Sequence, residues 1–246
     1  MRVTFVLAAL FATTVAHAHV GPSKDDNNRY LKLTPQADRV RFAYTIFIGE
    51  VPGAHYRATI DTDGNGEISE AEAQAFGDKL GEQVRTAIDV DVDKNQRSLV
   101  WEQIVVGMGS PNTRAGAFSV DLVANLCLAP GTTHAVILRD RFVLPSPGET
   151  EVKLEDTHGI KITSAKLGGS SDRDVKFVGP GGPLADEGVT IAFEVTDQAA
   201  PPSGECTTPP APADRARLPA TLVVGAAAVL AFLLALVITV VRRKRA

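Results

Sequence analysis

The sequence predicts a mainly β protein, an antiparallel β-sandwich-like extracytoplasmic domain that carries one inserted acidic loop and helix and continues into a single C-terminal transmembrane helix. Three observations support this prediction. Apolar residues alternate with polar ones in many short runs, one segment has apolar residues spaced by three and four instead, and a long uncharged stretch lies near the C-terminus. A chain of 246 residues, 44% hydrophobic and 22% charged, is suited to one or two globular domains.

The charge distribution excludes nucleic acid as a partner. All 29 acidic residues lie between residues 19 and 217, whereas five of the 25 basic residues lie outside that range. The middle of the chain is therefore clearly acidic and would repel phosphates, but it would attract cations.

The N-terminus resembles a secretory signal. Residues 1–18 contain one positive charge, an apolar run too short to cross a bilayer and the tripeptide Ala16-His17-Ala18, so cleavage is expected before His19. A membrane anchor is the alternative. A cleaved signal directs the following domain, residues 19–198, out of the cytoplasm.

The C-terminus predicts attachment to the cell membrane. Residues 218–241 contain an uncharged stretch rich in Leu, Val and Ala, which is long enough for a transmembrane helix. The basic tail at 242–246 places that end in the cytoplasm, so the main domain is extracytoplasmic, periplasmic or extracellular, in a single-pass type I arrangement. A Pro-rich tether, residues 199–217, joins the domain to this helix.

Strand periodicity begins early in the domain. From Leu31 to Val51, residues Val40, Phe42 and Tyr44 belong to a series spaced by two, which is typical of a strand with one buried face. Turn signals such as Ser146-Pro-Gly148 separate the later runs. Further strands are expected at 89–93, 99–106, 118–128, 134–143, 151–154, 160–167, 175–177 and 189–195.

One segment predicts a helix instead. Ala73, Phe76, Leu80 and Val84 recur at intervals of three and four, and the pattern continues to Ala87 or Ile88, giving an amphipathic helix of about five turns. Two glycines within it lower its intrinsic helix propensity.

The acidic loop before this helix has the spacing of a calcium ligand set. Residues 61–72 match D-x-[DN]-x-[DN]-G-x5-E at every position. A hard cation requires six to eight oxygens, and Gly66 permits the sharp turn that brings them together. In such a loop the ion is bound by side chains at positions 1, 3, 5 and 12, a backbone carbonyl at position 7 and a water held at position 9. The predicted metal ligands are therefore Asp61, Asp63, Asn65, Glu67, Ser69 and Glu72.

The expected cofactor is one Ca²⁺ ion. Three carboxylates and neutral oxygens in a flexible loop suit Ca²⁺ better than octahedral Mg²⁺, and the absence of His and Cys disfavours zinc and copper. Two alternatives remain. Ser69 and Glu72 also spell a helix capping box, so Glu72 could cap the helix when no ion is bound. The segment from Asp91 to Glu102 partly repeats the ligand spacing, but it is interpreted as a strand and a turn.

Residues 61–72 resemble the EF-hand superfamily, and we place the EF-hand at about 52–88. A second resemblance starts at His19-Val-Gly and continues through Asn28-Arg-Tyr30 and the run from Asp38 to Pro52 into the acidic loop. That part of the chain is similar to the soluble N-terminal domain of bacterial nickel/cobalt transporters, without the permease half. The likeness implies an extracytoplasmic accessory domain that works beside a transporter.

The remaining candidates are weaker. If the signal is cleaved, His19 becomes the N-terminal residue and offers an amine and an imidazole to Ni²⁺ or Cu²⁺. The alternative is that His19 is simply a frayed terminal residue. Cys127 and Cys206 either form a disulfide or leave Cys127 free and buried. No catalytic constellation stands out, so an enzyme is not expected. The leading hypothesis is a membrane-anchored calcium-binding protein with an unidentified protein or transporter partner, and the alternatives are an accessory to nickel or cobalt transport and a surface adhesion or scaffolding protein.

Overall fold

A computed structural model describes residues 25–207, and these residues form a mainly β structure with two sheets, as predicted. The signal segment 1–18, His19, the end of the tether, the expected transmembrane helix at 218–241 and the tail at 242–246 lie outside the described residues. Within 25–207 no helix has the length and apolar character needed to cross a bilayer.

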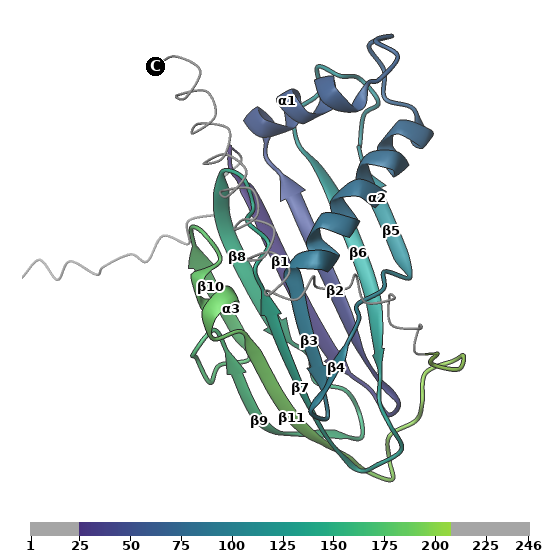
Figure 1. Ribbon diagram of the computed structural model, residues 1–246, viewed down its shortest axis with the longest axis vertical. Coiled ribbons are helices and arrows are strands. Elements are labelled where there is room, and N and C mark those ends of the chain that lie inside the picture. Colours follow the sequence, from purple (N-terminus) through teal and green to yellow (C-terminus); the bar gives the residue numbers. More distant parts are fainter. Residues whose placement is uncertain (1–24, 208–246) are drawn as a thin grey trace, which may run out of the picture. The chain divides into compact units, whose positions relative to one another are not determined.

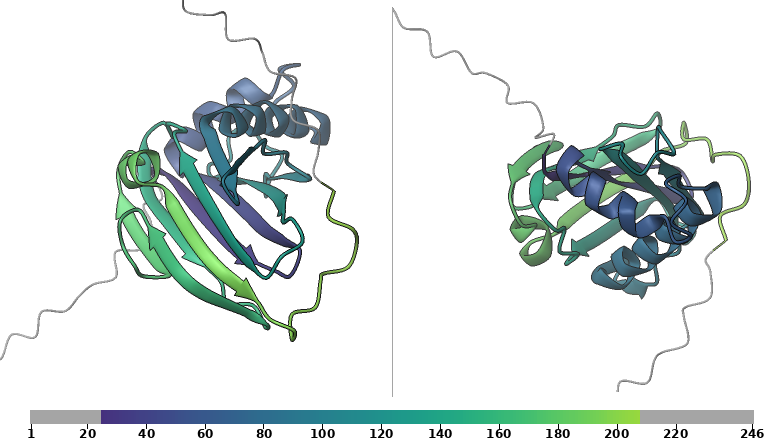
Figure 2. Two further views of the ribbon diagram at one scale, coloured as in Figure 1. Left: turned by 60° about the horizontal axis from the view of Figure 1, so that its bottom comes forward. Right: turned by 90° about the horizontal axis from the view of Figure 1, so that it is seen from above.

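The two sheets form two layers that share one core (Figures 1 and 2). The first sheet has six strands, in the spatial order β10 (Asp174–Val178), β8 (Pro147–Leu154), β1 (Asn27–Pro35), β2 (Arg39–Ile48), β6 (Phe118–Cys127) and β5 (Gln103–Gly107). The second has five, in the order β4 (Asn95–Arg97), β3 (Ile88–Val92), β7 (Thr133–Asp140), β11 (Val189–Val195) and β9 (Ile160–Leu167).

The core lies between the layers because alternate residues of each strand point inward. In β2 the residues Phe42, Tyr44 and Ile46 are fully buried, and β7 and β11 contribute Leu138 and Phe193 from the other layer. A buried ion pair also joins the sheets, with Arg29 Nη1 2.7 Å from Asp140 Oδ2. Tyr44 donates its hydroxyl to the same oxygen at 2.9 Å, so the pair has a polar partner inside the core.

The expectation of antiparallel strands is wrong for one pair. β1 and β8 run parallel, from Asn27 beside Pro147 to Leu33 beside Leu154. The chain reaches β8 by crossing over from β7 in the other sheet, and such a crossover does not impose the antiparallel direction that a hairpin does. The first sheet is therefore mixed, and the second is antiparallel throughout its described pairs.

Three local boundaries also differ from the sequence prediction. The expected run from 31 to 51 is two strands followed by a helix, α1 (Glu50–Ile60), whose first turn accommodates Pro52. The run at 99–106 is a strand only from Gln103, and Trp101 before it donates its indole N–H to the carbonyl of Gly81. Only Ser146 of the predicted 146–148 turn has a positive φ, and β8 begins at Pro147.

The predicted amphipathic helix is confirmed as α2 (Glu70–Ala87), with 18 residues. Its two glycines serve close packing, since a Cβ at Gly77 would lie 2.6 Å from Val106 Cγ2 and one at Gly81 would lie 3.0 Å from Ile104 Cδ1. A short helix, α3 (Gly182–Asp186), occupies part of a segment in which the sequence predicts only turns. α1 lies at one end of the strands, and α2 runs from that end across the face of the first sheet beside β5 and β6 (Figure 1).

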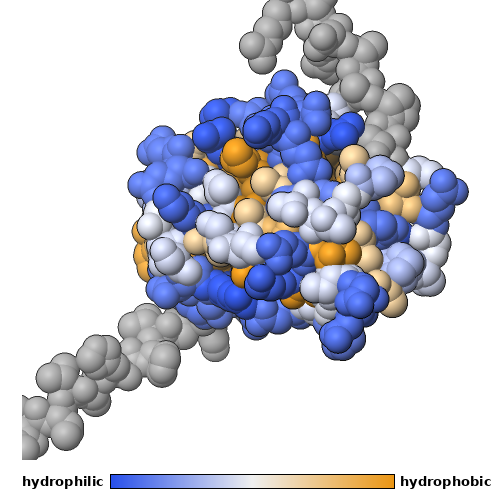
Figure 3. Space-filling view, turned by 90° about the horizontal axis from the view of Figure 1, so that it is seen from below, coloured by the Kyte–Doolittle hydropathy of each residue, from blue (hydrophilic) through white to orange (hydrophobic). Residues whose placement is uncertain are grey.

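A disulfide between Cys127 and Cys206 joins the end of β6 to the start of the expected tether. Arg39 binds the same segment, since its Nη2 donates to the carbonyl of Gly204 at 2.6 Å. β2 pairs Arg39 with Cys127 and Ile48 with Phe118, so the disulfide lies at the end of these strands away from α1. Viewed from that end, the surface is mostly hydrophilic, and hydrophobic residues are visible between the hydrophilic ones (Figure 3).

We expect replacement of both cysteines by serine to lower the free energy of unfolding by about 2–4 kcal/mol. The bond joins residues 79 positions apart, so removing it frees a long loop in the unfolded chain. Urea unfolding of the full chain, with and without reductant, measures the effect. Equal stability of the oxidised protein and the Cys127→Ser, Cys206→Ser double variant would show that the bond does not constrain the unfolded chain.

Candidate metal centre

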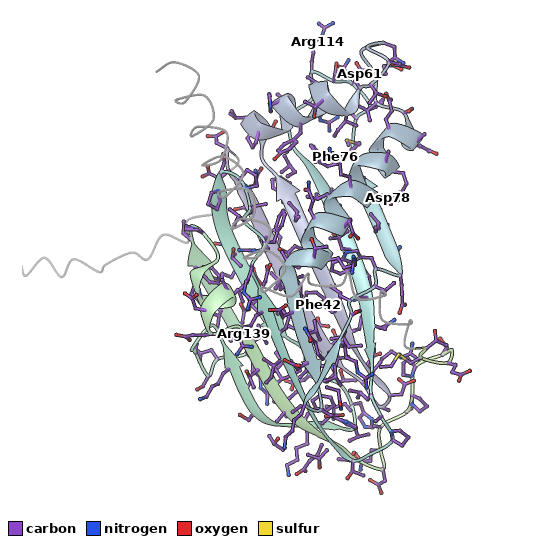
Figure 4. The ribbon with its side chains drawn as sticks, viewed as in Figure 1. Phe42, Asp61, Phe76, Asp78, Arg114 and Arg139 are labelled. Carbon is purple, nitrogen blue, oxygen red and sulfur yellow. A yellow bond between two sulfur atoms is a disulfide. The ribbon has the colours of Figure 1, made fainter. Side chains whose placement is uncertain are left out.

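The acidic loop connects α1 to α2 at one end of the molecule. Asp61 is the C-cap of α1 and Ser69 is the N-cap of α2, so both ends of the loop are fixed by helices. Figure 4 shows Asp61 at the point where α1 ends and the loop begins. The loop thus has the helix-loop-helix context that its motif requires.

Three predicted ligands converge. One carboxylate oxygen from each of Asp61, Asp63 and Glu72 lies within 4.8 Å of the other two. Among residues 25–207 they are the one group of three or more His, Cys, Asp or Glu side chains placed closely enough to share a metal ion. The group contains hard anionic oxygens alone, which are the donors that Ca²⁺ prefers.

Backbone amides orient the side chains of the loop. Gly66 N–H donates to Asp61 Oδ2 at 2.9 Å, Asn65 N–H to Asp63 Oδ1 at 3.1 Å, and Glu67 N–H to Asn65 Oδ1 at 2.7 Å. Gly66 has a φ of 88°, which an L-residue with a Cβ rarely adopts. The loop therefore curves around its own carboxylates, and its Asp61, Asp63 and Asn65 side chains are held by main-chain contacts.

Glu72 closes the loop from the first turn of α2. Its Oε1 accepts from Thr62 N–H at 2.7 Å and from Thr62 Oγ1 at 2.8 Å. Its Oε2 accepts from Ser69 N–H at 2.9 Å and from Ser69 Oγ at 2.8 Å, and Ser69 Oγ accepts from Glu72 N–H. The hydrogen bond from the Ser69 backbone contributes most, and with the others it lowers the pKa of Glu72 from 4.5 to about 2.

This geometry is the capping box that the sequence allows for the metal-free loop. The three converging carboxylates suit a calcium ion in their chemistry, but they supply fewer than the six to eight oxygens that it requires, and Ser69 and Glu72 bond to one another. Ion binding would exchange some of these hydrogen bonds for contacts to the ion, while Asp61, Asp63 and Asn65 already have their backbone supports. Glu67 forms an isolated antiparallel bridge with Asn112.

A second segment, residues 108–117, holds the loop from the side. Ile68 N–H donates to the Pro111 carbonyl at 2.7 Å, and Thr113 N–H donates to the Gly66 carbonyl at 3.1 Å. Ile68 is 5% exposed, so its side chain anchors the loop to the core. The 108–117 segment has no acidic residue, so it supports the loop without forming a second cation site.

Arg57 of α1 organises this supporting segment. Its side chain is 0% exposed, and its guanidinium donates to five backbone carbonyls, those of Met108, Ser110, Asn112, Gly116 and Ala117. It also lies over the ring of Phe118, with Cζ 5.4 Å from the centroid. Burial is the main cause that lowers the pKa of Arg57, while Glu50 acts in the opposite direction.

Neither Arg57 nor the 108–117 segment was predicted from the sequence. No motif marks either one, because the five acceptors are backbone carbonyls that any residue type supplies. The sole sequence signal for a buried Arg57 is that it lies within one helical turn of the apolar Ile60. Arginines are usually exposed, so this spacing did not predict its burial.

The alternative ligand segment at 91–102 does not form a second loop. Asp91 lies in β3, and Asp93 and Lys94 form the β3–β4 turn with φ of 52° and 66°. Asp93 accepts a hydrogen bond from Ala135 N–H, while Glu102 accepts one from Asn125 on β6. Their carboxylates have different partners, as the interpretation as strand and turn predicts.

No protein-family model matches the chain, and no curated protein sequence is significantly similar to it.

In the metal-free protein we expect the Glu72 carboxyl to titrate near pH 2, well below its ordinary 4.5. A lowered folded-state pKa means that Glu72 contributes to stability above about pH 4.5 and loses that contribution as the pH falls toward 2. Carbon-detected NMR of the side chain measures the titration. Ser69→Ala should move the pKa back toward 4.5, and an unshifted pKa in the parent protein would show that the capping box is absent in solution.

Proposed function

We propose that this chain is a membrane-anchored extracytoplasmic calcium-binding protein, with an EF-hand inserted in a β-sandwich-like domain. The convergence of Asp61, Asp63 and Glu72 within 4.8 Å is the observation that carries the proposal. Asn65, the carbonyl of Glu67 and a water held by Ser69 complete the proposed ligand set. The ion would order the loop and fix α2 on the sheet, where the domain can present a surface to a protein partner.

The compartment is proposed on two grounds. The sequence carries a signal-like N-terminus and an apolar stretch followed by basic residues at the C-terminus. The Cys127–Cys206 disulfide is a bond that persists in oxidising surroundings outside the cytoplasm. Millimolar calcium outside the cell suits a site of modest affinity, with a Kd on the order of 10⁻⁴ to 10⁻³ M.

The donor set favours calcium over the nickel or cobalt of the alternative proposal. Carboxylates and carbonyls suit hard cations, whereas imidazole suits nickel. The one residue offered for transition-metal capture, His19, lies outside the described residues. An accessory role in nickel or cobalt transport therefore has no support from the described geometry.

Thermal unfolding of the full chain tests the proposal. At ~1 mM free Ca²⁺ and a Kd of ~0.1 mM, binding stabilises the folded state by about 1.4 kcal/mol. For a chain of this size the melting temperature should rise by roughly 3–6 °C over the chelated protein. Mg²⁺ at the same concentration should give a smaller rise. An identical melting temperature with chelator and with Ca²⁺ would refute the proposal.

A further inference from the structure

α2 is apolar on two faces, and the sheet covers one of them. Ala73, Gly77, Gly81 and Val84 are buried, and the two glycines allow Ile104 and Val106 of β5 to approach closely. This face accounts for the helix's attachment to the first sheet. The second face includes Phe76 and Leu80, which pack only partly against the core.

The second face lines a groove of about 670 Å³ between α2, α1, the end of β2 and residues 142–145. Its walls include Ala75 and Phe76 of α2, Tyr56 and Ile60 of α1, Ile48 of β2 and Leu144. Figure 4 shows Phe76 in the space between the two helices. The volume falls within the roughly 300–1,000 Å³ of small-molecule sites.

Two of the lining residues, Tyr56 and Phe76, belong to a set of packed aromatic rings. Phe76 makes edge contacts with Tyr56 and Phe118, with centroids 5.8 Å apart in both pairs. Val143 at the groove is 79% exposed, although its neighbour Leu144 is buried. The groove therefore offers an apolar wall that the described residues 25–207 leave open.

The charges of the groove select the sign of its ligand. Its lining contains one cation, Lys79, and one carboxylate, Glu72. Glu72 is bonded to Thr62 and Ser69. Lys79 is exposed and forms no ion pair within residues 25–207. Glu72 is ionised, but both of its carboxylate oxygens already accept hydrogen bonds, so Lys79 is the charged group of the lining that is left to pair with a ligand. An apolar cavity with such a cation at its edge suits an apolar molecule with one anionic group.

We propose that this groove binds a free long-chain carboxylate, whose alkyl chain lies on Tyr56 and Phe76 and whose headgroup pairs with Lys79. The proposal goes beyond calcium binding and does not depend on it, so it is tested in the presence of chelator as well as of Ca²⁺.

The test is photo-crosslinking of a palmitate analogue with a diazirine in its tail. The full chain is placed in phosphatidylcholine nanodiscs, and unlabelled palmitate is the competitor. We expect saturable labelling that maps by mass spectrometry to α2 or to residues 142–145, and weaker competition by the methyl ester. Labelling confined to residues 218–241, or labelling that does not saturate, would overturn the proposal.

Two variants and their matched controls locate the site. Lys79→Gln should weaken palmitate binding about tenfold, the size of one charge-assisted hydrogen bond. Ala75→Phe should abolish saturable labelling by filling the groove. Lys166→Gln on β9 and Ala54→Phe on the outer face of α1 remove the same charge or add the same ring at exposed positions, and should leave binding unchanged.

Other occupants give different results. Competition by phosphatidylglycerol in the nanodisc as strong as that by palmitate would assign the groove to bilayer lipid. A dimer in sedimentation experiments that Ala75→Phe dissociates, without palmitate labelling, would assign it to a second copy of the chain. Either result would overturn the proposal, and near-UV circular dichroism establishes that each variant is folded.

Discussion

Glu72→Gln is expected to abolish calcium binding while it preserves α2. Gln at the third helical position also forms a capping box, so the metal-free helix keeps its N-terminal hydrogen bonds. The ion, however, loses the one carboxylate that can bind it with both oxygens. We expect the Kd to rise beyond the roughly 10–100-fold that loss of an outer-shell partner costs. Asp61→Asn should weaken binding similarly, because it removes a second of the converging carboxylates.

Ser69→Ala is the complementary variant. It removes the capping hydroxyl that donates to Glu72 at 2.8 Å, but leaves the carboxylates in place. The free energy of unfolding should fall by about 1 kcal/mol in the metal-free protein, and calcium should still bind. Wild-type affinity in Glu72→Gln, combined with lost affinity in Ser69→Ala, would contradict the ligand assignment.

Arg57→Leu is expected to have the largest effect on stability, a loss of about 3–5 kcal/mol. Leucine fills part of the space but leaves five carbonyls of the 108–117 segment without their donor in a buried site. Because this segment bonds to the loop through Ile68 and Thr113, calcium affinity should fall as well. Urea unfolding and calcium titration of the same variant measure the two effects.

Arg114→Leu provides the matched control. Arg114 belongs to the same segment and carries the same charge, but it is exposed, and Figure 4 shows it pointing away from the fold. Its replacement should change stability by less than about 0.5 kcal/mol. Equal effects of the two substitutions would mean that charge, and not the buried hydrogen bonds of Arg57, stabilises the segment.

The sequence predicted those parts of the molecule whose cause is local. Helix α2 follows from the spacing of Phe76, Leu80 and Val84, and the convergence of the carboxylates agrees with the spacing of Asp61, Asp63 and Glu72. The strands β3, β6, β9 and β11 lie close to the runs from which they were expected. In each case a pattern within about 20 residues determines the result.

What the sequence did not predict depends on contacts between distant segments. The parallel pairing of β1 with β8 joins residues more than 110 positions apart, and nothing in Leu31 or Val152 specifies its partner. Arg57 meets the carbonyls of Ser110 and Gly116 through backbone atoms that carry no sequence information. The sequence left open whether Cys127 and Cys206 form a disulfide, and the fold brings the two residues together.

Isothermal titration of the full chain with Ca²⁺, beside Glu72→Gln, tests the central claim most directly. The account predicts saturable binding of one ion per chain, with a Kd on the order of 10⁻⁴ to 10⁻³ M, and no binding by the variant over the same range. Absence of saturable heat, or equal binding by both proteins, would contradict the assignment of the loop as a calcium site.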